Sequence, residues 1–236
     1  MFVLIGGKAN KQILTNNIEN EIIKLSKKEK PTILYVGYAA TNLEKSNNKF
    51  RDLMKNLNCE ILFMDYNNIN SFEILLNKSD ILYIGGGVSD DLIEFFKANK
   101  LDVILKNHIN DNKIFAGSSA GAMLYTKASM GDKYMFLDNF HNYNYKMVNC
   151  LNILNITICP HYQNEDLIIY NDELKKYDCD AFGIEEDSAL VIDGNKFYCL
   201  KEENRVSVYY FKKDENYRMI SLKKGEIYEK DSGFRS

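Results

Sequence analysis

Arginine is scarce in this chain, and its scarcity limits the ligands that we expect the protein to bind. The 236 residues include four arginines, scattered along the sequence: Arg51, Arg205, Arg218 and Arg235. No cluster is visible that could clamp an anion between paired guanidinium N–H donors. The formal net charge of -3 also argues against a nucleic-acid partner, because neutralising phosphates requires a basic face.

The cysteines lack the arrangement of a metal site or a disulfide framework. Their number is odd and no C-x-x-C occurs among Cys59, Cys150, Cys159, Cys179 and Cys199. This pattern disfavours zinc ligation and structural disulfides, and it fits reduced thiols in the cytosol. We therefore expect a cytoplasmic protein with no metal and no cofactor.

Long apolar runs are also missing. No segment approaches the ~18 consecutive apolar residues that span a bilayer, so we expect no membrane partner. The first seven residues, Met-Phe-Val-Leu-Ile-Gly-Gly, lack the charged start and long apolar core of a signal peptide, and they indicate a strand and a turn. The overall composition, 45% hydrophobic and 27% charged, is that of an ordinary globular protein.

The first half of the chain contains a regular succession of short apolar runs and amphipathic segments. The apolar runs predict buried strands at residues 2–5, 33–36, 61–64, 81–84 and 114–116. The segments between them predict helices, the last of which is a single helix over residues 89–109. Buried strands that alternate with helices are typical of a parallel sheet covered on both faces. We predict a three-layer α/β/α fold with a mainly parallel sheet, in a single domain spanning residues 1–236.

The second half is less regular. Residues 131–149 predict an irregular excursion, residues 153–159 a strand and residues 165–177 a helix. Short strands are expected at residues 181–184 and 189–192, and Asp193-Gly194 then predicts a hairpin to residues 196–200. Alternating patterns at residues 206–211 and 217–222 complete a predicted C-terminal antiparallel β extension.

The segment Gly117-Ser118-Ser119-Ala120-Gly121 matches G-x-S-x-G and lies between a predicted strand and a helix-forming segment. A sharp turn there would expose the Ser119 hydroxyl, with glycines that tolerate unusual backbone angles. The Ala120 amide would begin the helix and form half of an oxyanion hole. The pattern predicts a nucleophilic serine, although Gly/Ser/Ala turns also join strands to helices without any catalytic role.

A serine nucleophile needs a base, and the chain contains three histidines. We expect His108 on a solvated face of a helix, and His141 lies in the irregular excursion. His161 follows Pro160 at the end of a predicted strand, in the same layer as Ser119. It is the best candidate for the base, although a strand-end histidine taken alone is structural at least as often as it is catalytic.

The pattern does not determine which acid would orient the base. Three carboxylates, Glu185, Glu186 and Asp187, follow a predicted strand, and their alternative role is that of a solvated acidic turn. Asp132 and Asp138, between the serine and the histidine, are further candidates.

Several motifs occur together in a fixed order: Gly85-Gly86-Gly87, the G-x-S-x-G turn, Pro160-His161-Tyr162 and Gly-Ile-Glu-Glu-Asp-Ser-Ala-Leu at residues 183–190. Together they resemble the peptidase E family of serine peptidases, which includes aspartyl dipeptidases and cyanophycinases. The resemblance extends from the first strand to about residue 192 and implies a fold related to class I glutamine amidotransferases, which is flavodoxin-like.

The resemblance also implies roles for particular residues. Ser119 corresponds to the nucleophile, His161 to the general base and Glu186 to the triad acid, while Gly87 and Ala120 would supply the oxyanion-hole amides. The chain order Ser, His, Glu differs from the Ser, acid, His order of α/β-hydrolases, which disfavours an esterase or lipase of that fold.

One feature departs from the family. Members that cleave N-terminal aspartyl dipeptides are expected to hold the aspartate with a basic side chain, often an arginine beyond the histidine. Between His161 and Glu186 this chain has only Lys175 and Lys176, which we expect to face solvent. Lys8 or another distant lysine could substitute.

The predicted function is that of a serine peptidase that hydrolyses small peptides through a Ser-His-Glu triad and an acyl-enzyme, as dipeptidase E does. The alternatives are a cyanophycinase-like or esterase activity, or a catalytically silent binding protein on the same scaffold. The sequence does not determine the natural substrate or the oligomeric state, for which a homodimer is one candidate.

Overall fold

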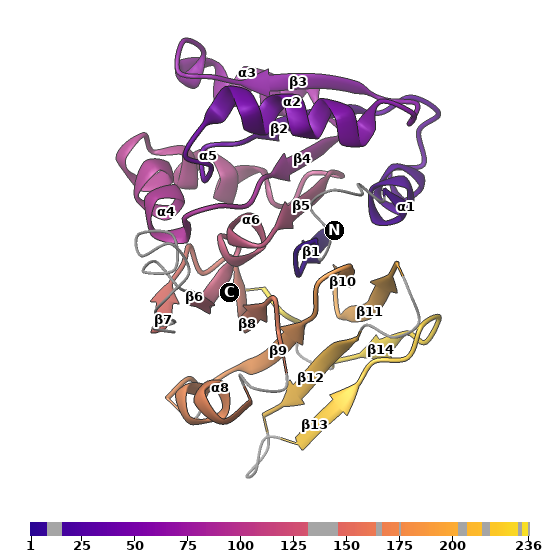
Figure 1. Cartoon of the computed structure of the whole chain (residues 1–236), viewed down its shortest axis with the longest axis vertical. Helices are drawn as coiled ribbons and strands as arrows, with labels where there is room; N and C mark the ends of the chain where they lie inside the picture. The colour runs from indigo at the N-terminus through magenta and orange to yellow at the C-terminus, as the bar shows by residue number, and fades with distance from the viewer. Residues whose placement is uncertain are drawn as a thin grey trace.

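The computed structural model describes residues 1–8, 16–131, 146–163, 167–174, 176–202, 207–213, 218–230 and 233–235. Within these residues the protein is a mixed α/β structure whose strands pair into two sheets (Figure 1). The first sheet has eight strands in the order β14-β11-β10-β1-β5-β4-β2-β3, and the second has six in the order β13-β12-β9-β8-β6-β7.

The first sheet has a parallel part and an antiparallel part. The parallel strands are β1 (Phe2–Ile5), β2 (Thr32–Val36), β3 (Glu60–Met64), β4 (Ile81–Ile84) and β5 (Ile114–Ser118). On the other side of β1, pairing becomes antiparallel through β10 (Ser188–Asp193), β11 (Lys196–Lys201) and β14 (Tyr228–Glu229). The β10–β11 hairpin confirms the turn predicted at Asp193-Gly194.

Helices pack on both faces of the parallel strands. Val3 and Ile5 of β1 lie in one hydrophobic cluster with the buried residues of α1 (Asn17–Leu25) and α2 (Leu43–Met54). Phe2 and Leu4 lie in the other cluster, which includes α3 (Phe72–Lys78), α4 (Ser89–Ala98), α5 (Leu101–His108) and α6 (Ala120–Met123), with the short helix η1 (Ile69–Ser71) preceding α3. Successive side chains of a strand point to opposite faces, so burial on both sides produces the continuous apolar runs of the sequence.

The prediction of one helix over residues 89–109 is wrong. The structure has α4 and α5, separated at Lys100, which adopts a left-handed backbone conformation with φ 56°. In an unbroken helix Phe96 and Leu101, five residues apart, would point about 140° away from each other. Both are buried in the same core, so the break turns the second apolar stripe back toward the sheet.

The second sheet is the largest difference from the sequence-based prediction of one sheet with an extension. It consists of parallel strands β6 (Thr126–Gly131), β8 (Leu154–Pro160) and β9 (Asp180–Ile184), flanked by antiparallel β7 (Lys146–Asn149), β12 (Val208–Lys212) and β13 (Arg218–Ser221). α8 (Leu167–Leu174) joins β8 to β9. Within residues 131–149, where an irregular excursion was expected, Gly131 ends β6 and residues 146–149 form β7, while residues 132–145 lie outside the described part.

The two sheets share one core and meet beside β1. Phe182 of the second sheet contacts Phe197 of the first at a ring-centroid distance of 5.6 Å, and both belong to the cluster that contains Leu4. β9 and β10 are consecutive in the chain but belong to different sheets. The turn between them, residues 185–187, lies beside the carboxyl ends of β1 and β8, because the Asp187 amide donates to the Gly7 carbonyl and the Tyr162 amide donates to the Ile184 carbonyl.

All five cysteines are free. Among the described helices, none combines the length and the apolar character needed to cross a bilayer.

His108 lies at the end of α5 between two carboxylates. Its side chain is 14% exposed, and its ring nitrogens lie 2.7 Å from Asp111 and 3.3 Å from Glu73. The solvated face expected for it is therefore only partly solvated. The hydrogen bond to Asp111, and secondarily the bond to Glu73, raises the pKa of His108.

We predict that His108→Gln lowers stability at acidic pH more than at alkaline pH. A raised folded-state pKa stabilises the fold below the unfolded value of about 6.5, and this contribution disappears as pH rises through the folded pKa. The loss should be less than about 1 kcal/mol, because the carboxylate partners are exposed. Urea unfolding of both proteins at pH 5.5 and pH 9 measures it, and an equal difference at both pH values would contradict it.

Candidate active site

The Ser119 turn joins β5 to α6 and has a strained backbone. Ser119 adopts φ 53° and ψ -117°, a conformation that side-chain-bearing residues rarely take. Its amide donates to the Ile5 carbonyl at 2.9 Å, and its own carbonyl accepts from the amides of Ala122 and Met123 at 2.9 and 3.0 Å. These bonds hold the turn between β1 and the first residues of α6.

Glycine is required on both sides of this turn. A Cβ atom at position 117 would lie 2.2 Å from the Gly121 carbonyl oxygen, and one at position 121 would lie 2.1 Å from the carbonyl oxygen of Ile84. The two glycines let β5, α6 and the end of β4 approach within backbone contact. This close packing sustains the strained Ser119 conformation.

The structure brings Ser119, His161 and Glu186 together from three separate parts of the chain. His161 Nε2 lies 2.8 Å from Ser119 Oγ, and His161 Nδ1 lies 2.7 Å from Glu186 Oε1. With the carboxylate accepting from Nδ1–H, Nε2 is the nitrogen that accepts the serine proton. The His161 and Glu186 side chains are 41% and 32% exposed, so the arrangement is open to solvent and to a substrate.

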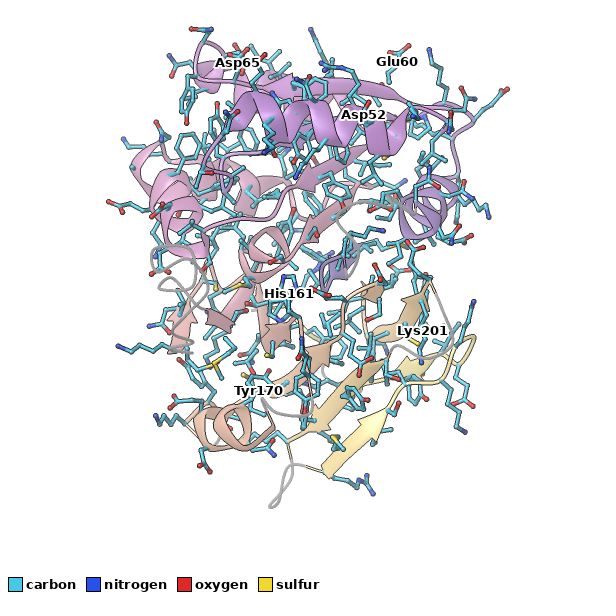
Figure 2. The ribbon with its side chains drawn as sticks, in the orientation of Figure 1. Asp52, Glu60, Asp65, His161, Tyr170 and Lys201 are labelled. Atoms are coloured by element: carbon cyan, nitrogen blue, oxygen red, sulfur yellow. The ribbon has the colours of Figure 1, made fainter. Side chains whose placement is uncertain are left out.

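The end of β1 supports the imidazole. His161 has a left-handed backbone conformation with φ 54°, and its amide donates to the Gly6 carbonyl at 2.9 Å. A Cβ atom at position 7 would lie 2.3 Å from His161 Cε1, so only glycine leaves room for the ring. In Figure 2, His161 lies near the middle of the molecule, between the upper and lower parts of the ribbon.

The other carboxylates considered from the sequence differ in placement. Glu185 accepts a hydrogen bond from the Ser207 amide at 2.7 Å and another from the Tyr209 hydroxyl at 3.1 Å, so it binds the segment around β12. Burial and this carboxylate raise the pKa of Tyr209. Asp187 has φ 57° and donates its amide to the Gly7 carbonyl. Asp132, Asp138 and His141 lie outside the described residues.

Backbone amides of the Gly85-Gly86-Gly87 turn lie beside the serine. A Cβ at position 86 would lie 3.1 Å from Ser119 Cβ, which places this backbone against the nucleophile turn. The flanking amides are already engaged, because Gly85 donates to Val36 and Val88 donates to Ala39. Gly87 has φ 149°, and a Cβ there would meet the Ala39 carbonyl oxygen at 1.9 Å.

Ala120 is the first residue of α6, as expected for the second amide donor. The helix spans only Ala120–Met123, so its macrodipole is small. Any favourable electrostatic contribution at this point therefore comes from individual N–H groups rather than from a helix macrodipole.

A pocket of about 380 Å³ opens beside Ser119 and His161, and sequence reasoning missed most of its wall. The wall comes from the end of β2 and from α2, and includes Lys45, Ser46 and Lys49. Their position could have predicted this wall, because these residues follow the carboxyl end of a predicted strand and Lys45 and Lys49 are four residues apart on one helix face. Lys45 and Lys49 are the basic side chains in the wall of this pocket.

The lysines considered from the sequence lie elsewhere. Lys176 is 64% exposed and pairs with Glu173 on the surface, as expected, and Lys175 lies outside the described residues. Lys8 does not line the pocket; its Nζ lies 2.7 Å from Glu202 and 3.2 Å from Glu19.

Comparisons with known proteins find similar peptidases. Residues 1–200 match the model of peptidase family S51. The chain is 24% identical over 151 residues to "Uncharacterized peptidase YgaJ" of Bacillus subtilis (strain 168), a match that covers 63% of this chain and 62% of that protein.

Two solved structures share the fold. A peptidase from an acI-B1 Actinobacterium superposes with a TM-score of 0.68 at 20% identity, over 97% of this chain and 96% of the other. A "Putative Peptidase E Protein" from Listeria monocytogenes EGD-e superposes with a TM-score of 0.61 at 16% identity, over 86% of this chain and 98% of the other.

Proposed function

Because the chain belongs to peptidase family S51, we propose that it is a serine-type dipeptidase that cleaves small peptides through Ser119, His161 and Glu186. The observation that carries the proposal is the continuous hydrogen-bonded series from the serine hydroxyl through the imidazole to the carboxylate, at 2.8 and 2.7 Å. Residues 1–236 would act as one catalytic domain without a cofactor. A cytoplasmic location is part of the proposal, and the five free thiols support it.

The first half of the proposed reaction forms an acyl-enzyme. His161 Nε2 takes the proton of Ser119 as the hydroxyl oxygen attacks the peptide carbonyl. The negative charge that develops on the carbonyl oxygen is held by the amides of Gly87 and Ala120, with Gly86 as a neighbouring donor. His161 then gives the proton to the leaving amine, and the C–N bond breaks.

The second half releases the product. Water enters the open site and loses a proton to His161 as it attacks the ester carbonyl, and the proton returns to Ser119 when the acid product leaves. Glu186 holds the imidazole in the tautomer that these proton transfers require, and it stabilises the imidazolium that forms twice per catalytic cycle.

The pocket beside the serine suggests which peptides fit. Lys45 and Lys49 are exposed at its edge, where they would attract a carboxylate of the substrate. Ser46, held by a 2.8 Å hydrogen bond to Tyr35, adds a neutral polar group to the same wall. A short peptide with a free carboxylate fits this charge pattern better than an uncharged ester does.

We predict that a Lys45→Ala/Lys49→Ala variant raises KM for acidic dipeptides about 5- to 50-fold and leaves kcat nearly unchanged. The lysines bind a remote charge, so their loss weakens ground state and transition state alike. Steady-state kinetics at low and moderate salt measures the effect, which should shrink as salt screens the charges. An unchanged KM for acidic dipeptides, or a KM increase that stays the same at high salt, would contradict it, and Lys176→Ala is the surface control.

A substrate panel tests the proposed function directly. Asp-containing dipeptides, neutral dipeptides, β-linked Asp-Arg dipeptides and p-nitrophenyl esters are offered to the purified protein at equal concentration. The proposal expects the highest kcat/KM with α-linked dipeptides. A preference for β-linked Asp-Arg or for esters would assign a cyanophycinase-like or esterase activity, and no turnover of any member would support a silent binding protein.

A further inference from the structure

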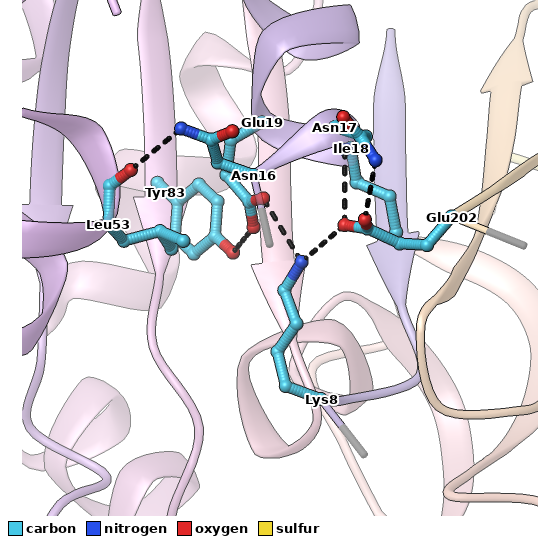
Figure 3. A network of polar contacts seen from close by, with 8 residues as sticks. All are labelled: Lys8, Asn16, Asn17, Ile18, Glu19, Leu53, Tyr83 and Glu202. Carbon is cyan, nitrogen blue, oxygen red and sulfur yellow. Dashed lines mark hydrogen bonds and ion pairs between the residues drawn. The ribbon is translucent and has the colours of Figure 1, made fainter. Parts of the chain in front are cut away.

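A buried cluster of charged side chains adjoins the Gly6–Gly7 segment, which contacts His161. Lys8 follows Gly6-Gly7 at the end of β1, and its ammonium group lies between the carboxylates of Glu19 on α1 and Glu202 after β11 (Figure 3). The three side chains are 17%, 0% and 3% exposed. We call these residues the Lys8 cluster.

Each carboxylate of the Lys8 cluster has further hydrogen-bond donors. Glu19 accepts from the Tyr83 hydroxyl at 3.1 Å. Glu202 accepts from the Asn17 side chain at 3.0 Å and, more weakly, from the Ile18 amide at 3.5 Å, at the first turn of α1. The cluster thereby ties β1, β4, α1 and the end of β11 to one ammonium group.

Burying these charges is costly, so stability alone is a poor explanation for them. Taking two carboxylates and an ammonium out of water costs several kcal/mol per ion, which mutual attraction offsets only when the geometry is good. Apolar side chains of similar size would commonly stabilise a fold as well or better. The position of the cluster suggests a second role.

Backbone hydrogen bonds connect the Lys8 cluster to the candidate active site. The Glu202 amide donates to the Asp187 carbonyl at 2.9 Å, and the Asp187 amide donates to the Gly7 carbonyl at 2.9 Å. Asp187 directly follows Glu186, and Gly7 contacts the His161 ring. Asp187 is therefore hydrogen-bonded both to Gly7, which contacts His161, and to Glu202 of the Lys8 cluster.

We propose that Lys8, Glu19 and Glu202 are positioning residues, which hold the Gly6–Gly7 segment so that His161 stays aligned between Ser119 and Glu186. None of the three touches the pocket or the reacting atoms. The cluster acts through the backbone of residues 6–7 and 187. The kinetic part of this proposal rests on the proposed function, whereas the structural part concerns only the His161–Glu186 hydrogen bond.

Removing the ammonium group should loosen that alignment. In Lys8→Met the two buried carboxylates lose the ammonium group that they share, so the segment shifts to relieve the uncompensated charge. A misplacement of about 1 Å can cost about 100-fold in rate, so we expect kcat to fall about 10- to 100-fold while KM changes less than about threefold. Lys8→Arg keeps the charge and should recover much of the loss.

The matched control removes a lysine–glutamate pair that has no link to the active site. Lys176 pairs with Glu173 on the exposed surface of α8 and the following turn. Lys176→Met should leave both kcat and KM unchanged. Glu202→Gln is the second variant of the cluster: it keeps the side-chain size but removes one charge, so it reports on alignment if Lys8→Met does not fold.

The deciding measurement is a proton NMR spectrum, which does not depend on turnover. A strong His161 Nδ1–H···Glu186 hydrogen bond gives a low-field proton signal, and with three histidines in the chain His161→Ala identifies it. The proposal expects this signal in the wild type and in Lys176→Met, and its weakening or upfield shift in folded Lys8→Met or Glu202→Gln.

The outcomes separate the two proposals. An unchanged signal and unchanged kcat in both folded cluster variants would overturn the positioning role and leave the proposed peptidase function intact. Absence of the signal from the wild type would instead contradict the His161–Glu186 pairing itself, and both proposals would fall with it.

Discussion

Ser119→Ala should abolish peptide hydrolysis, with kcat falling roughly 10⁴- to 10⁶-fold. The alanine has no oxygen to form the acyl-enzyme, and His161 then has no hydroxyl to activate. Fold and substrate binding should persist, because the turn is held by backbone bonds to Ile5, Ala122 and Met123 rather than by the hydroxyl. Initial rates on the best dipeptide, with a thermal melt of both proteins, measure the effect.

Ser118→Ala is the matched control, since Ser118 is the neighbouring hydroxyl in the same Gly-Ser-Ser sequence. It ends β5 and pairs with Ile5, and no hydrogen bond joins it to His161 in the described part of the chain. This variant should retain most of the wild-type activity. If Ser118→Ala were inactive and Ser119→Ala active, the assignment of the nucleophile would be reversed.

The second large effect is expected at Glu186. Glu186→Gln keeps the side-chain shape, but its amide no longer compensates the charge of the imidazolium and favours the wrong histidine tautomer. We expect kcat to fall about 10³- to 10⁴-fold with a small change in KM, as for the loss of a triad acid. Steady-state kinetics with a dipeptide substrate across pH 6–9 gives the comparison.

Glu185→Gln tests the alternative acid with the same chemical change one residue away. Glu185 binds the Ser207 amide and the Tyr209 hydroxyl, so its variant should lose stability while turnover stays within about threefold of the wild type, as expected for a residue outside the reacting groups. The opposite ranking of the two variants would show that Glu185 serves as the acid.

The ends of the parallel strands could be predicted from the sequence, because the apolar runs and the glycines that follow them indicate the same positions. Apolar runs such as Ile81–Ile84 terminate in glycines, and strands buried on both faces must be apolar throughout. Since parallel strands end at one edge, Gly87 and Ser119 could be placed near each other before any coordinates. His161 could be placed near the same site because it follows Pro160 at the end of a further predicted strand.

The second sheet could not be predicted in the same way. Its strand Lys146–Asn149 has only four residues, none of them buried, and is identified by its pairing with residues 128–131 across the sheet. Thr126 and Ser129 are fully buried but read as surface residues in the sequence; their hydroxyl groups lie 2.9 Å apart. Such burial depends on strands that are remote in sequence, and the local pattern of apolar residues cannot predict it.

The choice among Glu185, Glu186 and Asp187 also lay beyond the sequence. The side chains diverge because residues 185–187 connect strands of two different sheets, and Asp187 takes a left-handed backbone conformation. The Glu185 carboxylate accepts a hydrogen bond from Ser207, just before β12, whereas the Glu186 carboxylate faces His161. Only the resemblance to a family, not the pattern of charges, favoured Glu186 in advance.

The most direct measurement of the central claim is covalent labelling with a fluorophosphonate probe, followed by mass spectrometry of the digested protein. A serine activated by an aligned imidazole should react, so we predict one adduct on the peptide that contains Ser119, lost in His161→Ala. An unmodified Ser119, or an adduct that forms equally well without His161, would contradict the account.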